Sequence, residues 1–155
     1  MEDNIKNTNK PSVHKILAHS YLLYLIFFLI GVFFDVFFPV KIFNNSIATP
    51  AGLVLLVLAT FLIFWAQKSS RILKTENMTK ETFCKGPYCY TRSPTHWGLF
   101  LLMLGFGIIA NATFIILTTL MSFLIARYFF LDKEEEILAE KYGTPYLEYK
   151  KSVTR

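Results

Sequence analysis

Charged residues are scarce in this chain, and internal repeats and low-complexity segments are absent. Only 17% of the 155 residues are charged, while 54% are hydrophobic and 16 are phenylalanine. This composition is too apolar for a soluble domain of this size, because the surface of such a domain needs more polar cover. The length leaves no room for a second domain. The sequence therefore predicts a single integral membrane domain.

Cysteine is also nearly absent, and its two positions exclude the usual cysteine-based sites. Cys84 and Cys89 are five residues apart. This is neither the spacing of a CxxC redox pair nor that of a zinc site, and further ligands are lacking nearby. We therefore expect no metal, and we expect both thiols to be reduced and without a special task.

The apolar residues gather in runs that can cross a bilayer, which needs about 20 residues per helix. The run from Trp97 to Leu131 has 35 residues and one charge. One helix of that length, at about 1.5 Å per residue, is longer than a hydrocarbon core of about 30 Å, so a break is expected at the polar interruption 110–113. The sequence predicts an all-α, polytopic membrane protein with four transmembrane helices, the last two forming a helical hairpin. The expected segments are a polar N-terminal tail (1–15), transmembrane helices at 16–38, 47–66, 95–110 and 113–131, and a short cytoplasmic helical tail (132–155), with 16–155 as one domain.

Lysine and arginine are distributed unevenly among the connections. Three precede the first apolar run, six lie between Gln67 and His96, and six lie from Arg127 onward. The first connection holds only Lys41, and the third holds none. Because positive residues mark the cytoplasmic side of a membrane protein, we expect both termini and the central loop in the cytoplasm. Charges that flank membrane helices also argue against nucleic-acid binding.

Two features inside the apolar runs also matter. Asp35 lies near the outer end of the first helix, and we expect it to reach interfacial water rather than to carry function. Small residues give the third helix a surface on which another helix backbone can approach closely. We expect this surface to serve packing rather than to admit a flat ligand. Its residues are Gly98, Gly105, Gly107 and Ala110.

Two polar segments carry the candidate chemistry. The first, at 86–94, is a proline-containing turn with Arg92 that enters the third helix, and the second follows the last apolar run with Glu134 and Glu135. An arginine complements an anion, carboxylates complement a cation, and aromatic faces attract a cation or a flat ring. The aromatic candidates are Tyr88, Tyr90, Trp97, Tyr142 and Tyr146. Structural roles stay open for all of these groups: a positive-inside anchor, a solvated helix face and an interfacial belt.

Together the two segments resemble the signature of the isoprenylcysteine carboxyl methyltransferase and phospholipid methyltransferase superfamily. The first motif is matched by Gly86, Tyr88, Arg92, Pro94 and Gly98. The second is matched by Glu134, Glu135, Leu138, Gly143, Tyr146 and Tyr149, with Tyr142 in place of phenylalanine. The resemblance covers about residues 50–155. It departs at Ser93 and His96, where the family has histidine and tyrosine.

The resemblance implies methyl transfer from S-adenosylmethionine to a membrane-resident acceptor at the cytoplasmic membrane face. The acceptor would be similar to an isoprenylcysteine carboxylate or to a phospholipid. Arg92 and Glu135 are implied as catalytic. The implied cofactor-binding residues are Tyr88, Arg92, Pro94, His96, Gly98, Glu134, Glu135 and Tyr146. A lipid or lipid-linked substrate in the membrane is the implied partner, with no nucleic acid and no obligate protein partner in evidence.

Two other function classes stay open. A membrane reductase of the sterol type resembles this superfamily in its C-terminal helices and uses NADPH. A catalytically degenerate member would be a membrane scaffold, and Ser93 in place of an imidazole fits an altered cofactor grip, a different acceptor or lost activity. Preference for NADPH over S-adenosylmethionine would identify the reductase, and the absence of cofactor binding would identify the scaffold.

Overall fold

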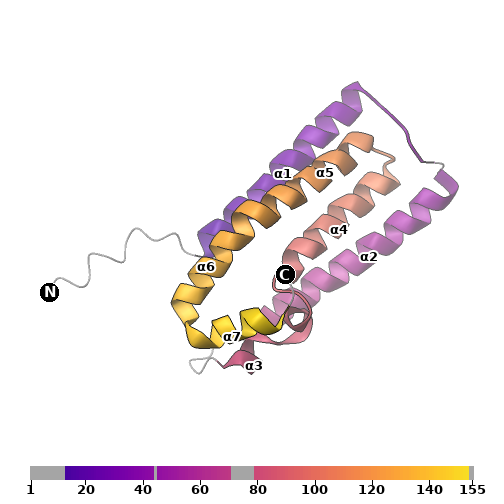
Figure 1. Cartoon of the computed structure of the whole chain (residues 1–155). Helices are drawn as coiled ribbons and strands as arrows, with labels where there is room; N and C mark the ends of the chain where they lie inside the picture. Colours follow the sequence, from indigo (N-terminus) through magenta and orange to yellow (C-terminus); the bar gives the residue numbers. More distant parts are fainter. Residues whose placement is uncertain (1–12, 44, 71–78, 154–155) are drawn as a thin grey trace.

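A computed structural model describes residues 13–43, 45–70 and 79–153 of the chain, and in these ranges the regular elements are all helices (Figure 1). Residues 1–12 of the expected polar tail and part of the central connection, 71–78, lie outside the described residues. The helices are α1 (Val13–Phe37), α2 (Asn45–Ser70), α3 (Lys80–Phe83), α4 (Pro94–Ile109), α5 (Thr113–Ile125), α6 (Leu131–Tyr142) and α7 (Thr144–Ser152), with a 3₁₀ turn η2 (Gly86–Cys89) and a π-helical turn η3 (Ala126–Phe130).

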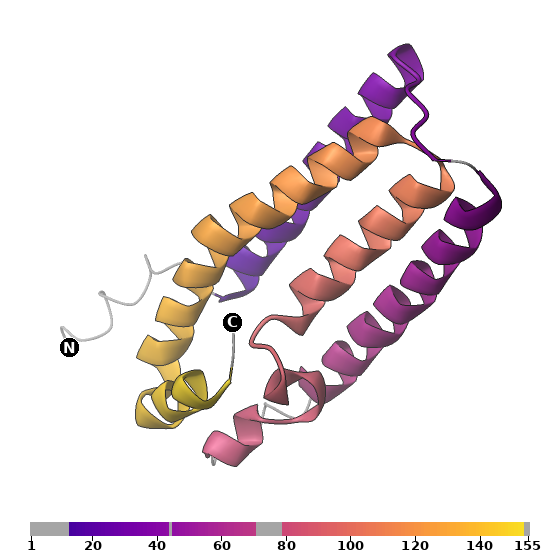
Figure 2. The same cartoon turned by 45° about the vertical axis from the view of Figure 1, so that its right-hand side comes forward.

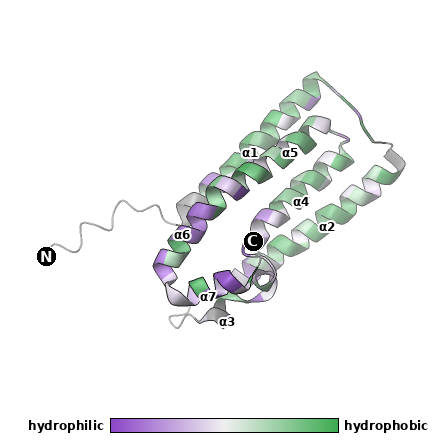
Figure 3. Cartoon of the chain, viewed as in Figure 1, coloured by the Kyte–Doolittle hydropathy of each residue, from purple (hydrophilic) through white to green (hydrophobic). Residues whose placement is uncertain are grey.

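Within the described residues, three helical segments are long and apolar enough to cross a membrane, at Ala18–Phe37, Ile47–Ser70 and Thr113–Tyr142. The chain is therefore an integral membrane protein. α4 is equally apolar but has only 16 residues. At about 1.5 Å per residue it spans about 24 Å, which is shorter than a hydrocarbon core of about 30 Å. Figure 3 shows that the hydrophilic residues gather at the end of the molecule formed by α6 and α7.

The long helices lie side by side in the order α1, α5, α4 and α2 (Figures 1 and 2). Glycines allow this close packing. A Cβ atom at Gly105 would lie 3.0 Å from the carbonyl oxygen of Gly52 on α2, and one at Gly107 would lie 2.9 Å from Ile116 on α5. The expectation that the small residues of this helix serve packing is confirmed at these positions.

The turn between α4 and α5 falls at the expected polar interruption. Asn111 has a positive φ of 52°, a conformation that asparagine adopts more readily than most residues. Its side-chain oxygen accepts hydrogen bonds from the backbone N–H groups of Ile42 and Phe43, at 3.1 and 2.9 Å. The connection that follows α1 is thereby fastened to this turn.

Asp35 has structural partners on α5 that the sequence did not predict. Its two carboxylate oxygens accept hydrogen bonds from the backbone N–H groups of Phe114 and Ile115, at 3.1 and 2.8 Å. These N–H groups belong to the first turn of α5, where no partner within the helix is available. Asp35 on α1 therefore caps α5.

We expected the fourth transmembrane helix to end near Leu131, but the last apolar helix continues past this residue. The helix continues through η3 into α6 and ends at Tyr142, because neither glycine nor proline interrupts it. Gly143 then has φ 62° and ψ −137°, a region open essentially to glycine alone. Pro145 follows in the first turn of α7, where its missing N–H is tolerated.

Cys84 and Cys89 form a disulfide, so the expectation of reduced thiols was also wrong. The η2 turn, which ends at Cys89, brings the Cα atoms of the two cysteines to 4.4 Å. This separation is at the short end of the range that disulfides adopt.

Candidate functional site

The two polar segments meet at the hydrophilic end of the molecule (Figure 3). The motif loop, which we define as residues 86–93, runs from η2 into α4. α6 and α7 supply the second segment, and the polar end of α1 lies against α6. We call the residues gathered here the polar-end site.

Gly86 brings the motif loop against α2. Its φ is 59°, and a Cβ atom at this position would lie 2.9 Å from Nε1 of Trp65 and would collide with the hydroxyl of Ser69. Only glycine fits this position, because both the backbone conformation and the space exclude a side chain. Tyr88 follows in the site, whereas Tyr90 is 77% exposed and does not join it.

Arg92 and Glu135 form the link between the motif loop and α6. The Arg92 Nη1 donates to Glu135 Oε1 at 3.0 Å, and Lys150 Nζ lies 2.8 Å from the other oxygen of the same carboxylate. The Arg92 Nε also donates to the backbone carbonyl of Val153, at 2.8 Å. Glu135 is only 4% exposed. A carboxylate that is this buried needs such partners, because an unpaired buried charge is costly.

α7 covers the motif loop through a second set of contacts. The Tyr149 hydroxyl donates to the backbone carbonyl of Tyr88 at 2.7 Å. Tyr146 and Tyr149 are both buried and pack with Phe83 and Val153. The second polar segment is therefore a structural part of the polar-end site and not a solvated tail.

His96 forms the other half of the site, toward α1. Its Nε2 lies 3.8 Å from Glu134 Oε2, a distance too long for a hydrogen bond, and its Nδ1 lies 3.5 Å from the hydroxyl of Ser20. The ring centroids of Tyr21 and Tyr24 lie 6.1 and 5.9 Å from that of His96. The imidazole is 2% exposed, so it is enclosed by α1, α4 and α6.

Burial governs the ionisation of the tyrosines on the polar side of the site. It raises the pKa of Tyr88, an effect that Glu134 reinforces and that hydrogen bonding with Thr95 opposes. Burial also raises the pKa values of Tyr146 and Tyr149 well above 10, with the Glu135 charge adding to the rise and Arg92 opposing it. These phenols therefore remain neutral hydrogen-bond donors at physiological pH.

The two glutamates differ in their charge balance. Glu135 already faces two cations, Arg92 and Lys150. Glu134 faces His96 and influences Tyr88 and Tyr21. Glu134 is consequently the carboxylate of this pair that can complement an additional cation. The nearby rings of Tyr88 and Tyr21 can attract the same cation. In the described ranges, no three metal-ligating side chains are placed to hold a metal ion.

Not every sequence-predicted site residue faces this cluster. Gly98 is buried against Ile63 of α2, on a different side of α4 from His96, which contacts α1. Trp97 packs on Phe100 and Phe123. Pro94 is buried as the first residue of α4 and sets the direction of the helix. These residues shape the scaffold around the site.

Sequence reasoning missed the contribution of α1. Ser20, Tyr21 and Tyr24 lie in an apolar run whose function we interpreted as membrane spanning. One signal was available: Ser20 and Tyr24 are four residues apart, so they occupy one face of the helix. Both side chains are buried. Lys150 was also missed, because a lysine near a chain end is usually solvated.

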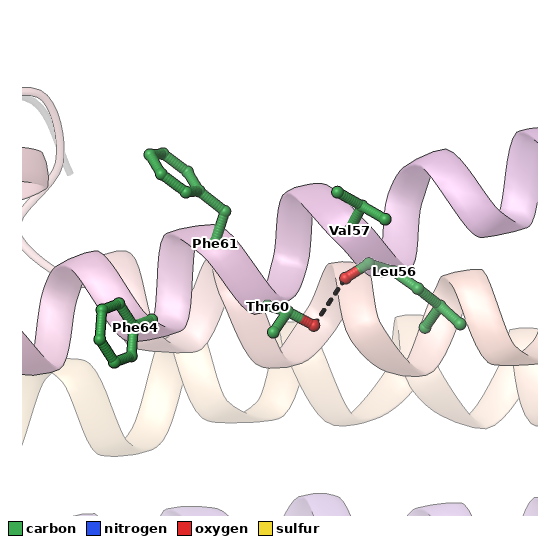
Figure 4. Close-up of a pocket in the computed structure, with 5 residues that line it drawn as sticks. All are labelled: Leu56, Val57, Thr60, Phe61 and Phe64. Atoms are coloured by element: carbon green, nitrogen blue, oxygen red, sulfur yellow. Dashed lines mark hydrogen bonds between the residues drawn. The ribbon is translucent and has the colours of Figure 1, made fainter.

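An apolar groove on α2 lies outside this cluster. It is lined by Leu56, Val57, Thr60, Phe61 and Phe64 (Figure 4). The Thr60 hydroxyl donates to the backbone carbonyl of Leu56 at 2.8 Å, so its polar group is already satisfied. The groove belongs to the membrane-spanning part of α2 and has no group suited to catalysis.

The chain was compared with known proteins. A family model described as phospholipid methyltransferase matches residues 47–145. No curated protein and no solved structure matches. The matched segment starts in α2 and ends at Pro145 in α7, so it contains the motif loop, Glu134 and Glu135 but not α1.

Proposed function

Because this chain belongs to the phospholipid methyltransferase family, we propose that it transfers a methyl group from S-adenosylmethionine to a lipid or lipid-linked acceptor in the membrane. The family is one of methyltransferases that act at membranes, and the chain is an integral membrane protein. The cofactor, the acceptor class and the residue roles below are our proposal. We place the active site at the polar-end site.

One observation carries the proposal. Two segments about 40 residues apart meet through the Arg92–Glu135 ion pair at 3.0 Å, beneath a C-terminal helix that packs over them. The family match includes both sides of this pair. A scaffold needs no such pairing, because a buried ion pair often contributes little net stability compared with apolar packing.

The residues present fit S-adenosylmethionine. The cofactor has a cationic sulfonium and ammonium, a carboxylate and an adenine ring. Glu134, with Tyr88 beside it, suits the cationic part. Arg92 has five N–H donors and uses two of them in the contacts to Glu135 and Val153, so others can bind the cofactor carboxylate.

When bound, the cofactor supplies an activated methyl group. What the chain must do is align the acceptor with this methyl and keep water away, since positioning supplies most of the rate in such a transfer. Arg92 and Glu135 fix the motif loop against α6, and Tyr146 and Tyr149 close the site from α7. His96 forms part of its wall, whereas Pro94 and Gly98 position α4 beside it.

The acceptor is a lipid or lipid-linked group that reaches the site from the bilayer. Tyr21 is 38% exposed on α1 and also adjoins His96, so the polar-end site extends to the lipid-facing surface. The excess of lysine and arginine at this end supports a cytoplasmic location for the site and for both termini.

The proposal is tested by methyl transfer from methyl-labelled S-adenosylmethionine to lipids in detergent micelles containing the purified protein. Phosphatidylethanolamine, N-acetyl-S-farnesylcysteine and a long-chain thiol represent the acceptor classes. We expect label in one lipid product and at least a tenfold loss of turnover in Glu134→Gln. Glu136→Gln is the matched control, because it removes the same charge from an exposed neighbour. Equal turnover in both variants would contradict the role of Glu134.

The same preparation separates the two alternatives. A reductase of the sterol type would bind NADPH and would not bind S-adenosylmethionine. A scaffold would bind neither while remaining folded. A change in stability alone does not decide between enzyme and scaffold, because the Arg92–Glu135 ion pair can stabilise the fold in either case.

A further inference from the structure

We propose that Tyr24 of α1 and His96 of α4 form a subsite for the polar head of the methyl acceptor. This inference rests on the proposed function and narrows its substrate class. The head group is neutral or cationic and forms hydrogen bonds with the Tyr24 hydroxyl and with Nε2 of His96. The subsite is defined by Ser20, Tyr21 and Tyr24 on α1, His96 on α4 and Glu134 on α6.

Unsatisfied polar atoms lie where α1 meets α4. In the described part of the chain, three buried side-chain atoms lack a hydrogen-bond partner: Tyr24 Oη, His96 Nε2 and Thr119 Oγ1. Buried polar groups are nearly always paired with protein, water or ligand. Two of these three unsatisfied atoms belong to the adjacent rings of Tyr24 and His96, whose centroids are 5.9 Å apart. Their shared location points to a ligand group between α1 and α4.

α1 packs on α5 and α6 along its length. It meets α4 through large rings, in the pairs Tyr24–His96 and Phe28–Phe106, which are 5.9 and 5.5 Å apart. Because Tyr21 at its polar end is partly exposed, a lipid head can enter there from the membrane surface.

The charges decide which head group fits. Glu134 lies 3.8 Å from His96, and its negative charge also acts on Tyr21. Arg92 is paired with Glu135 and bonded to Val153, and our proposal assigns its remaining donors to the cofactor carboxylate. An anionic head such as a carboxylate would be repelled by the Glu134 carboxylate. A neutral or protonated amine or a hydroxyl would be attracted.

The family match begins at residue 47, after α1 has ended. The cofactor-facing motifs lie inside the match, whereas Ser20, Tyr21 and Tyr24 lie outside it. A first helix that the family pattern does not define is a suitable place for residues that select an acceptor. The structure assigns this task to Tyr24, which is 1% exposed and whose hydroxyl has no hydrogen-bond partner.

The test uses the full-length protein in detergent with S-adenosylhomocysteine bound and its histidines labelled with ¹⁵N. A short-chain phosphatidylethanolamine is titrated in, and the His96 signal is identified by its disappearance in His96→Gln. We expect the Nε2 resonance of His96 to shift, and Tyr24→Phe to weaken the lipid affinity about tenfold, the effect of losing one hydrogen bond to a polar head. N-acetyl-S-farnesylcysteine, which carries a carboxylate, should bind at least tenfold more weakly than the amine lipid.

The matched control is Thr119→Val, which removes the third of the unsatisfied polar atoms, the Thr119 hydroxyl. Tyr24 packs against Ala126, and Thr119 lies seven residues before Ala126 in the same continuous helix. At 1.5 Å per residue this is about 10 Å, so Thr119 lies away from the subsite. We expect both variants to unfold no earlier than the wild type, because each removes a buried hydroxyl that has no partner. Only Tyr24→Phe should change lipid affinity.

Each outcome has a distinct meaning. A wild type that binds S-adenosylhomocysteine but shows no shift of His96, or equal lipid affinity in Tyr24→Phe and Thr119→Val, overturns the subsite and leaves the proposed function standing. Tighter binding of the carboxylate overturns the assignment of the head group. A folded wild type that does not bind S-adenosylhomocysteine overturns the proposed function and the subsite with it.

Discussion

Glu135 meets two cations that come from different segments of the chain. Arg92 from the motif loop and Lys150 from α7 lie 3.0 and 2.8 Å from its two oxygens. In Glu135→Gln the partly buried Arg92 guanidinium loses its charged partner, which we expect to lower the free energy of unfolding by about 2 kcal/mol. Cofactor affinity should fall at least tenfold, because the motif loop is no longer fixed to α6. Thermal unfolding and calorimetric titration measure the two effects.

Lys150→Ala is the comparison for this prediction. The Lys150 side chain is 40% exposed, so water replaces much of its contact with Glu135 and the loss should be smaller. Wild-type stability together with wild-type cofactor affinity in Glu135→Gln would contradict the role given to this residue.

Tyr146 and Tyr149 predict a response to alkaline pH. Burial raises the pKa of both phenols in the folded protein, whereas an unfolded chain releases these protons near pH 10. Above that pH the unfolded state binds fewer protons than the folded state, so stability is complete below about pH 10 and falls as the pH rises further. Unfolding by circular dichroism at increasing pH should show this decline. The variant with both tyrosines replaced by phenylalanine should show a smaller decline, and an equal decline would contradict the assignment.

At the residue scale, the sequence allowed one half of the site to be predicted. Arg92, Glu134 and Glu135 were found because charged residues beside membrane helices stand out against an apolar background. His96 was also named from the motif, whereas Tyr24 was harder to interpret. A tyrosine within an apolar run has the composition of a lipid-facing or packing residue, and its burial against His96 depends on the order of the helices, which hydropathy does not specify.

At the element scale, Asp35 holds the C-terminal end of α1 against the N-terminal end of α5. Its carboxylate accepts two N–H groups from the first turn of α5. We expect Asp35→Ala to lower the free energy of unfolding by about 1–2 kcal/mol, the usual cost of removing a helix cap. Asp35→Asn should lose less, because the amide keeps one accepting oxygen. Thermal unfolding in detergent provides the comparison.

Cofactor affinity should be preserved in both Asp35 variants. Fifteen residues of α1 separate Asp35 from Ser20, or about 22 Å at 1.5 Å per residue. A variant of Asp35 with intact stability, or one that loses cofactor binding while folded, would contradict the capping role.

The helices themselves were largely predictable, because their limits follow from local chemistry. The apolar runs, the polar interruption near Asn111 and the glycine at 143 all correspond to features of the structure. The end of the fourth apolar helix was not predictable from hydropathy. Hydropathy marks where a chain leaves the membrane, whereas a helix ends only where its backbone is interrupted, and α6 continues to Tyr142. The π-helical turn η3 also has no evident sequence signal.

At the scale of the whole molecule, two observations favour opposite orientations in the membrane. The lysine and arginine distribution supports a cytoplasmic polar end, whereas disulfides such as Cys84–Cys89 persist mainly in oxidising compartments. We predict that the positive residues decide the orientation. A green fluorescent protein fused to the C-terminus should fluoresce in a bacterial host, and an alkaline phosphatase fused there should be inactive. The reverse result would contradict the cytoplasmic location.

The central claim is that the polar-end site binds S-adenosylmethionine. The most direct test is calorimetric titration of the detergent-purified, folded protein with S-adenosylhomocysteine, with NADPH as the control ligand. We predict micromolar binding of S-adenosylhomocysteine, no binding of NADPH, and loss of the heat signal in Arg92→Ala and Glu135→Ala. Absence of binding in the folded wild type, or a preference for NADPH, would contradict the claim.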